Sequence, residues 1–298
     1  MPFNRIAIYG HRGWASTAIV KALARSGAPI RVLHQPTSDT SMLPASISTS
    51  SVDLGDEEST VEALKDIDIV ISLVGHEGIA RQFGLIKAIP KTQVKLFVPS
   101  DMSHEIDEQG SRIPVLKLKR EVEEATRTAG IAMTLVRPCY LVESSIRTLQ
   151  VDSIPSIVRP NTLNYVAAAY TSLFASTPIS ELSGRIFGIS ELSPTGDEIA
   201  KALEAKYGQK PEILHHSLQK IDREIDLALD NGSPGATVWY YRRLWGAGKL
   251  PHLMGSDIWT VPDYRKMSLD ELVVQDKLEA YRDLPQPVLE RLLATFTK

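Results

Sequence analysis

Two glycines three residues apart, Gly10 and Gly13, stand where the backbone could approach a phosphate group closely. They follow Arg5–Tyr9, an apolar segment typical of a strand, and precede Ser16–Arg25, whose apolar residues recur at helical spacing. In such a strand-to-helix turn, glycines admit a pyrophosphate and the free amides at the helix start stabilise its charge. We therefore predict that a dinucleotide contacts the turn, which consists of Gly10, His11, Arg12, Gly13 and Trp14.

The turn departs from the usual glycine-rich pattern at two positions. Ser16 stands where a third glycine is common, and Trp14 is large for such a loop. Glycines here also fit a second interpretation, in which they serve only the geometry of the turn.

The end of the next apolar segment, Ile30–His34, distinguishes the two nicotinamide dinucleotides. An acid at this point binds the ribose hydroxyls of NAD, whereas an arginine pairs with the 2′-phosphate of NADP. The chain has His34 and Gln35 here, and Arg12 in the glycine turn offers a cation. These residues favour NADP over NAD as the cofactor. Arg12 and His34 fit ordinary solvated surface positions almost equally well.

Small and polar residues follow two later apolar segments of the predicted sheet. Ligands of open α/β sheets bind outside the carboxyl ends of the strands, so these residues are expected to lie near a bound cofactor. We predict that the cofactor contacts Gly75, His76, Pro99 and Ser100. Asp101, the next residue, is predicted to contact the substrate, although it also fits a helix cap or a turn.

Apolar runs and amphipathic stretches alternate in the first half of the chain. The predicted strands are Arg5–Tyr9, Ile30–His34, Ser51–Leu54, Asp68–Val74, Val94–Pro99 and Ala132–Val136. The predicted helices are Ser16–Arg25, Ser59–Leu64, Ile79–Ile89 and Leu118–Thr128. This alternation predicts an α/β fold, a Rossmann-type doubly wound parallel sheet that forms a dinucleotide-binding domain over residues 1–152.

Residues 153–298 are expected to form a smaller C-terminal α+β region that covers the substrate. Its predicted elements are helices at Asn164–Phe174 and Pro194–Tyr207, and a strand at 184–190 that rejoins the sheet. The remainder, Pro211–Lys298, is predicted to be irregular, and its aromatic cluster Trp239–Trp245 is interpreted as packing rather than as a pocket. Tyr140 and Glu143 follow a sheet strand and are predicted to contact the substrate instead.

Composition excludes several classes of partner. A formal charge of −3 without a basic run gives no electrostatic reason to expect nucleic acid or an anionic membrane as a partner. The single cysteine, Cys139, and the lack of Cys/His pairs at ligand spacing favour a reducing compartment without a structural metal site. No signal-peptide pattern or membrane-length apolar run is present. We expect a cytoplasmic protein with a small-molecule substrate, and the oligomeric state is not predicted.

Three segments in the middle of the chain form a recognisable pattern, namely Phe97–Asp101, Lys119–Glu123 and Gly130–Glu143. In these segments the chain resembles the NmrA-like and isoflavone-reductase-like atypical short-chain dehydrogenases. The resemblance covers about the first 200 residues and implies an NADP-dependent reductase in which Lys119 is a catalytic acid/base and contacts the cofactor. The family's arginine at the end of the second strand is replaced by Gln35, and the Tyr-x-x-x-Lys signature of other short-chain dehydrogenases is absent.

Lys119 also has an ordinary interpretation. A lysine beside a nicotinamide can protonate or position a substrate oxygen, and burial would lower its pKa toward the working range. However, the charged run Lys117–Glu124 also permits an exposed ion pair between Lys119 and Glu123, four residues apart on a helix.

Three functions fit these residues. The first is an NADP-dependent reductase of a small aromatic, enone or imine-type metabolite, as in secondary metabolism. The second is a non-catalytic NAD(P)-sensing regulator of NmrA type, which the altered positions Ser16 and Gln35 permit. The third is a non-redox isomerase or cyclase that uses the same scaffold.

Overall fold

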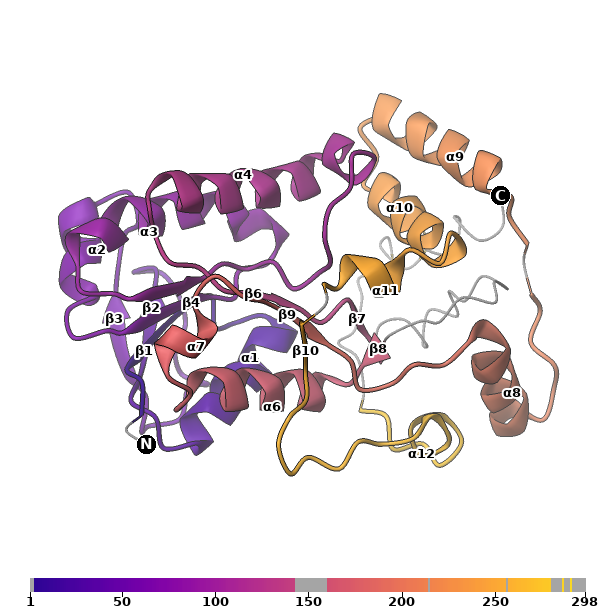
Figure 1. Cartoon of the computed structure of the whole chain (residues 1–298), viewed down its shortest axis with the longest axis horizontal. Coiled ribbons are helices and arrows are strands. Elements are labelled where there is room, and N and C mark those ends of the chain that lie inside the picture. Colours follow the sequence, from indigo (N-terminus) through magenta and orange to yellow (C-terminus); the bar gives the residue numbers. More distant parts are fainter. Residues whose placement is uncertain are drawn as a thin grey trace.

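The computed structural model describes residues 3–142, 160–213, 215–255, 257–279, 286 and 290 (Figure 1). Its main sheet has five parallel strands in the order β3-β2-β1-β4-β5. The strands are β1 Ile6–Tyr9, β2 Ile30–His34, β3 Ser48–Ser51, β4 Ile69–Ser72 and β5 Leu96–Val98. The strand order reverses at β1, which confirms the expected Rossmann-type α/β fold and places a switch point between β1 and β4.

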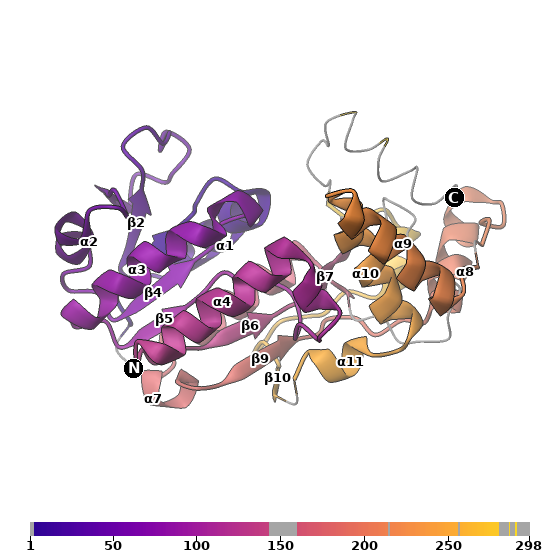
Figure 2. The same ribbon diagram turned by 90° about the horizontal axis from the view of Figure 1, so that it is seen from above.

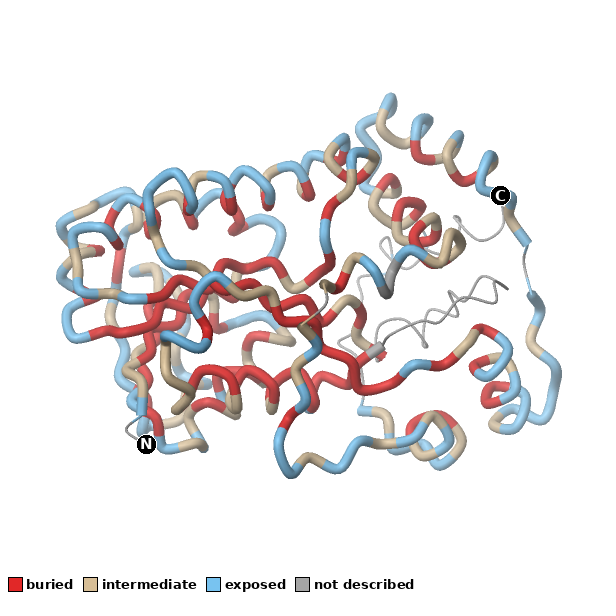
Figure 3. Tube along the Cα trace, in the orientation of Figure 1, coloured by how far each residue is buried: buried red, intermediate tan, exposed pale blue. Residues whose placement is uncertain are grey.

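Helices cover both faces of this sheet (Figure 2). One face packs on α1 (Trp14–Arg25) and α6 (Leu163–Phe174). The other packs on α2 (Glu57–Ala63), α3 (Gln82–Ala88) and α4 (Pro114–Thr128). Because both faces are covered, strands β1, β4 and β5 are fully buried and almost entirely apolar, whereas the edge strand β3 is polar and mostly exposed. Figure 3 shows buried residues concentrated along the central strands.

A second parallel sheet extends the first. Its order is β10-β9-β6, with β6 at Leu135–Arg137, β9 at Ile186–Ile189 and β10 at Asp257–Trp259. A bridge between Phe97 and Met133 connects β5 to the segment before β6. The strand expected at 184–190 therefore pairs with β6. The predicted domain boundary at residues 152 and 153 lies outside the described residues.

Further elements lie outside the two sheets and their covering helices. They are the 3₁₀ helices η1 His76–Arg81, η2 Ile89–Lys91 and η3 Gly110–Arg112, the strand pair β7 Tyr140–Leu141 and β8 Pro160–Asn161, and the helices α7 Ile179–Leu182, α8 Gly196–Tyr207, α11 Leu250–Leu253 and α12 Leu269–Val273. The helix predicted at Ile79–Ile89 is thus divided into η1, α3 and the start of η2. The strand predicted at Ser51–Leu54 is shifted to Ser48–Ser51.

The prediction that Pro211–Lys298 is irregular was wrong. This region contains α9 (Leu218–Asp230) and α10 (Gly235–Gly246), which pack against each other. On α9, Ile221 and Ile225 lie four residues apart and form one buried stripe, and the charged residues between them are partly or fully exposed, so the helical period can be recognised in the sequence.

The aromatic residues of α10 pack the C-terminal helices onto the Rossmann domain. Trp239, Tyr240 and Leu244 share a buried cluster with Ile113 and Leu116, which lie at the start of α4. Figures 1 and 2 accordingly show α10 beside the amino-terminal end of α4. The interpretation of these aromatic residues as packing residues is confirmed.

Candidate functional site

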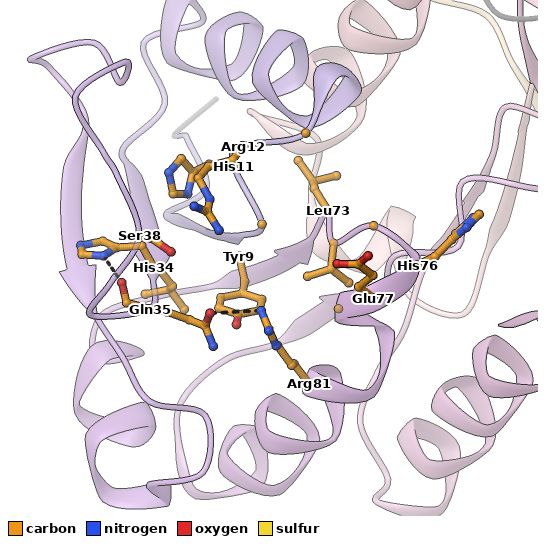
Figure 4. Close-up of a pocket in the computed structure, with 16 residues that line it drawn as sticks. Tyr9, His11, Arg12, His34, Gln35, Ser38, Leu73, His76, Glu77 and Arg81 are labelled. Atoms are coloured by element: carbon orange, nitrogen blue, oxygen red, sulfur yellow. Dashed lines mark hydrogen bonds between the residues drawn. The ribbon is translucent and has the colours of Figure 1, made fainter. Parts of the chain in front are cut away.

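A cavity of about 590 Å³ opens at the carboxyl ends of β1, β2 and β4 (Figure 4). It brings together many of the residues predicted to bind the cofactor, namely Gly10, His11, Arg12, Gly13, His34, Gln35, Gly75 and His76. Its lining also includes residues that were not predicted to bind the cofactor, namely Tyr9, Leu33, Ser38, Leu73, Val74, Glu77, Gly78 and Arg81. The cavity therefore lies where open α/β sheets bind their ligands.

The glycine turn forms one wall of the cavity and has the properties of an anion site. Gly13 caps α1 without a side-chain hydrogen bond, and the first turn of α1 contains no acidic residue. The positive end of the helix dipole is thus left to an external anion. Ser16, in the place of a third glycine, is buried and donates a hydrogen bond from its Oγ to the Gly13 carbonyl (2.9 Å). Its hydroxyl thus braces the turn.

Gly10 is required by the turn itself. Its φ is +96°, and a Cβ at this position would lie 2.8 Å from the Leu73 carbonyl carbon and 2.8 Å from the Val74 nitrogen. Only glycine allows β1 to turn this close to the end of β4.

Replacement of Gly10 by alanine is expected to destabilise the protein by about 2–4 kcal/mol, because it combines backbone strain with overpacking against main-chain atoms. Urea unfolding measures this loss. Gly130→Ala is a matched control, because Gly130 also has a positive φ (+68°), but a Cβ added there would have no other atom within 4 Å. Equal losses for the two variants would contradict the close-approach argument.

A second wall follows the end of β2. The Ser38 amide donates to the Gln35 carbonyl (2.9 Å), which closes a turn and returns Ser38 to the cavity. Arg81 comes from η1, and its Nη1 donates to Gln35 Oε1 (3.1 Å). No local pattern in the sequence indicates this pair, because the two residues are 46 positions apart and follow different strands.

Besides Lys119, three residues predicted to bind the cofactor do not line the cavity: Trp14, Pro99 and Ser100. Trp14 begins α1, and Pro99 and Ser100 are buried after β5. The Ser100 hydroxyl donates to the Val74 carbonyl (2.7 Å), and its amide donates to Gln82 Oε1 (2.8 Å). Ser100 thus joins the ends of β4 and β5 beside the cavity, and the cofactor contacts of all three residues stay predictions.

Lys119 lies in a buried group of charges behind Ser100. Its Nζ donates to the Asp101 carbonyl and lies 4.0 Å from Asp101 Oδ1. Burial lowers the pKa of the Lys119 ammonium, an effect that the negative charges of Asp101 and Glu123 oppose. Lys119 is outside the cavity lining, so its predicted contact with a cofactor and its catalytic role stay predictions.

The alternative interpretation of Lys119 as one member of an exposed ion pair was wrong. Its side chain is 8% exposed, whereas the side chain of Lys117 on the same helix is 66% exposed. Glu123 instead accepts a hydrogen bond from Arg127 (Nη2 to Oε2, 3.1 Å). The difference arises because position 119 faces the sheet and position 117 faces solvent.

Asp101 is held inside the protein by two partners. Its Oδ1 accepts a hydrogen bond from Ser103 Oγ (2.9 Å), and its Oδ2 lies 3.4 Å from Arg137 Nε. Its side chain is 2% exposed, so a substrate contact through this carboxylate stays a prediction that would require the group to become accessible.

Tyr140 belongs to an aromatic cluster near these charges. Its ring meets those of Trp245 and Tyr241 at centroid distances of 4.6 and 5.6 Å, and the His104 ring lies 5.4 Å from that of Tyr241. Burial raises the pKa of the Tyr140 phenol well above its ordinary value. Tyr140 is not among the residues that line the cavity at the ends of β1, β2 and β4. Glu143, the other predicted substrate contact, lies outside the described residues.

The described part of the chain contains no group of three or more His, Cys, Asp or Glu residues arranged to hold a metal ion. Within the same residues, no helix combines the length and the apolar character needed to cross a bilayer.

Known proteins share both this sequence pattern and this fold. Phenylcoumaran benzylic ether reductase IRL1 of Ginkgo biloba is 32% identical over 146 residues, which is 45% of this chain and 48% of the relative. The chain therefore spans about half the length of that curated relative. The fold resembles the solved pinoresinol-lariciresinol and phenylcoumaran benzylic ether reductases (TM-score 0.74, 18% identity), with 91% of this chain and 98% of the other covered.

A second solved structure, the leucoanthocyanidin reductase–NADPH complex from Vitis vinifera, covers 99% of this chain and 100% of the other, with a TM-score of 0.67 and 16% identity. The sequence profile described as the NmrA-like family matches residues 2–229. This match covers the glycine turn, the second wall of the cavity and the buried charges around Lys119. The chain belongs to the NmrA-like family.

Proposed function

We propose that the protein is an NADP(H)-dependent reductase of a small organic metabolite. The observation that carries this proposal is the cavity at the carboxyl ends of β1, β2 and β4, with its glycine turn and the uncapped start of α1. The reductases among its relatives and structural neighbours support the same class of reaction, and one of those neighbours is a complex with NADPH.

The residues present fit a dinucleotide phosphate. The amides at the start of α1 suit the pyrophosphate, because the N-cap residue Gly13 has no side chain that could bond to them. Two guanidinium groups, those of Arg12 and Arg81, line the cavity, and no acidic residue stands at the end of β2. This balance of charge favours NADP over NAD. When bound, NADPH supplies the hydride for the reduction.

Lys119 is the residue proposed to handle the proton. Burial lowers the pKa of its ammonium, so the group gives up a proton more readily than an exposed lysine. The Asp101 carbonyl orients Nζ at the end of β5, beside Ser100. We assign Lys119 the protonation or positioning of a carbonyl-type or imine-type group of the substrate.

The substrate class is proposed to be a small aromatic, enone or imine-type compound. One relative is named as a phenylcoumaran benzylic ether reductase and another as an isoflavone reductase-like protein, and both names refer to aromatic compounds. These names support an aromatic substrate.

The proposal is tested by NADPH oxidation with a panel of quinones, enones, imines and phenolic ethers. We expect substrate-dependent loss of NADPH absorbance with at least one class, and a much slower reaction with NADH. If NADPH binds in calorimetry but no compound is turned over, the protein is not a reductase of this kind.

One observation favours a second candidate function, that of an NADP-binding regulator. The Lys119 side chain is 8% exposed and its ammonium is bonded to a main-chain carbonyl, an arrangement that also serves a purely structural role. A regulator would bind NADP(H) without turnover, and Lys119→Met would leave its cellular effect intact.

A further inference from the structure

Arg81 reaches the end of β2 from the opposite side of β1. It is the last residue of η1, which follows β4, and β4 and β2 flank β1 in the sheet. Its Nη1 donates to Gln35 Oε1 at 3.1 Å. Figure 4 shows the Arg81 side chain extending past Tyr9 to Gln35. The Arg81 guanidinium therefore lies at the end of β2, where the guanidinium of an arginine that follows β2 would also lie.

The charges around this guanidinium leave it without an acidic partner. Within the described residues, no carboxylate lies within 4.0 Å of the Arg81 guanidinium, and the one side-chain hydrogen bond of Arg81 is to the neutral Gln35 amide. Glu77, the acid in the cavity lining, lies beside His76, away from Gln35 (Figure 4). Asp39 lies near Arg12, but its Oδ1 accepts the Ser41 amide (2.8 Å) and the residue is not part of the lining.

Neutral hydrogen-bond partners complete this end of the cavity. Gln35 fixes the direction of the guanidinium through an acceptor that adds no charge, so the positive charge of Arg81 is not neutralised. Ser38 lies in the same lining, on the turn closed by its amide and the Gln35 carbonyl. A cation and a serine hydroxyl in the same lining suit a phosphate monoester, which offers both charge and acceptor oxygens.

We propose that Arg81, held by Gln35, binds the 2′-phosphate of NADP(H) and determines the preference for NADP over NAD. This inference rests on the proposed function. It assigns to Arg81, which follows β4, the contact with the 2′-phosphate that an arginine at the end of β2 would otherwise make. Arg12, on the glycine turn, contributes a second positive charge to the same cavity.

The test is isothermal titration of the full chain with NADP⁺, NAD⁺, 2′,5′-ADP and 5′-AMP. For Arg81→Ala, we expect the Kd of NADP⁺ and of 2′,5′-ADP to rise about 10- to 100-fold, the range for loss of a hydrogen bond to a charged group. The Kd of NAD⁺ and of 5′-AMP is expected not to change, because these ligands lack the 2′-phosphate. Lys87→Ala is the matched control, since it removes an exposed cation from α3 outside the cavity lining.

Two further variants separate binding from structural effects. If Gln35 acts by holding Arg81, then Gln35→Ala weakens NADP⁺ binding, and the double variant Gln35→Ala/Arg81→Ala binds no more weakly than Arg81→Ala alone. In the Arg81→Ala background, Gln35→Arg is expected to recover NADP⁺ affinity, because it returns a guanidinium to the same place.

The outcomes distinguish this inference from the proposed function. If NADP⁺ binds more tightly than NAD⁺ and Arg81→Ala leaves the ratio of their Kd values unchanged, the role of Arg81 is refuted and the proposed function stands. Equal affinity of the unmodified protein for NADP⁺ and NAD⁺ also refutes it. If none of the four ligands binds, the proposed function itself fails.

Discussion

Replacement of Lys119 by methionine is expected to lower kcat for the reductase reaction by about 10²- to 10⁴-fold, the range for loss of a positioned proton donor. Methionine keeps the length and apolar stem of the side chain and removes the ammonium. NADPH affinity is expected to change little, because the phosphate-binding groups lie in a cavity that Lys119 does not line. Steady-state kinetics and calorimetry measure the two effects separately.

The matched control for this variant is Lys117→Met. Lys117 lies on the same helix, but its side chain is 66% exposed and its Nζ is 3.8 Å from Glu121, so its removal is expected to leave kcat unchanged. Equal kcat values for Lys119→Met and the unmodified protein would refute the catalytic assignment and favour the regulator.

The pH dependence of activity and of stability provides a second test of the role of Lys119. Burial lowers the pKa of its ammonium from the ordinary value of 10.5. As a proton donor, Lys119 must be charged, so activity falls as pH rises through this lowered pKa. Stability changes in the opposite direction. Between the lowered pKa and 10.5 the unfolded chain binds the proton and the folded chain does not, so the free energy of unfolding rises with pH. Both dependences should be absent in Lys119→Met.

Replacement of Arg137 by methionine is expected to destabilise the fold by about 3–5 kcal/mol, the cost of leaving a buried charge without its partner. Arg137 ends β6, and its side chain is 6% exposed. Its Nε lies 3.4 Å from Asp101 Oδ2 and its Nη1 lies 3.6 Å from Glu105 Oε2. Without Arg137, Lys119 is the remaining cation near the Asp101 carboxylate, at 4.0 Å. Chemical unfolding measures the loss.

Arg185→Met is the comparison that tests the importance of burial. Arg185 forms a shorter pair with Asp257, with N–O distances of 2.7 and 2.9 Å, but its side chain is 41% exposed. We expect its removal to cost about 0–1 kcal/mol, because water screens and replaces an exposed pair. If Arg137→Met lowers the free energy of unfolding by no more than Arg185→Met does, the buried pair of Arg137 and Asp101 does not stabilise the fold as described.

The local patterns of the sequence determined most of the Rossmann half. Ile6, Ala7 and Ile8 are fully buried because both faces of the sheet are covered, and such strands are recognisable from an unbroken apolar run. The turn at Gly10 and Gly13 was equally predictable, since its requirement for glycine arises within a few residues. By contrast, the prediction missed α9 although its apolar residues recur at helical spacing among charged ones, and only the tertiary structure shows that this apolar stripe packs in one cluster with α10.

The site depends on contacts that no local pattern contains. The order β3-β2-β1-β4-β5 places the connections after β2 and β4 on either side of β1, and this alone brings Arg81 to Gln35 across 46 residues. The packing of α4 on the sheet buries Lys119 and leaves Lys117 in solvent, although both belong to one charged run. The sequence by itself thus determined the glycine turn and the parallel strands, because backbone geometry and hydrophobic period are local properties. The tertiary structure decided which charges are buried and which face the cavity, because strand order and helix packing set those distances.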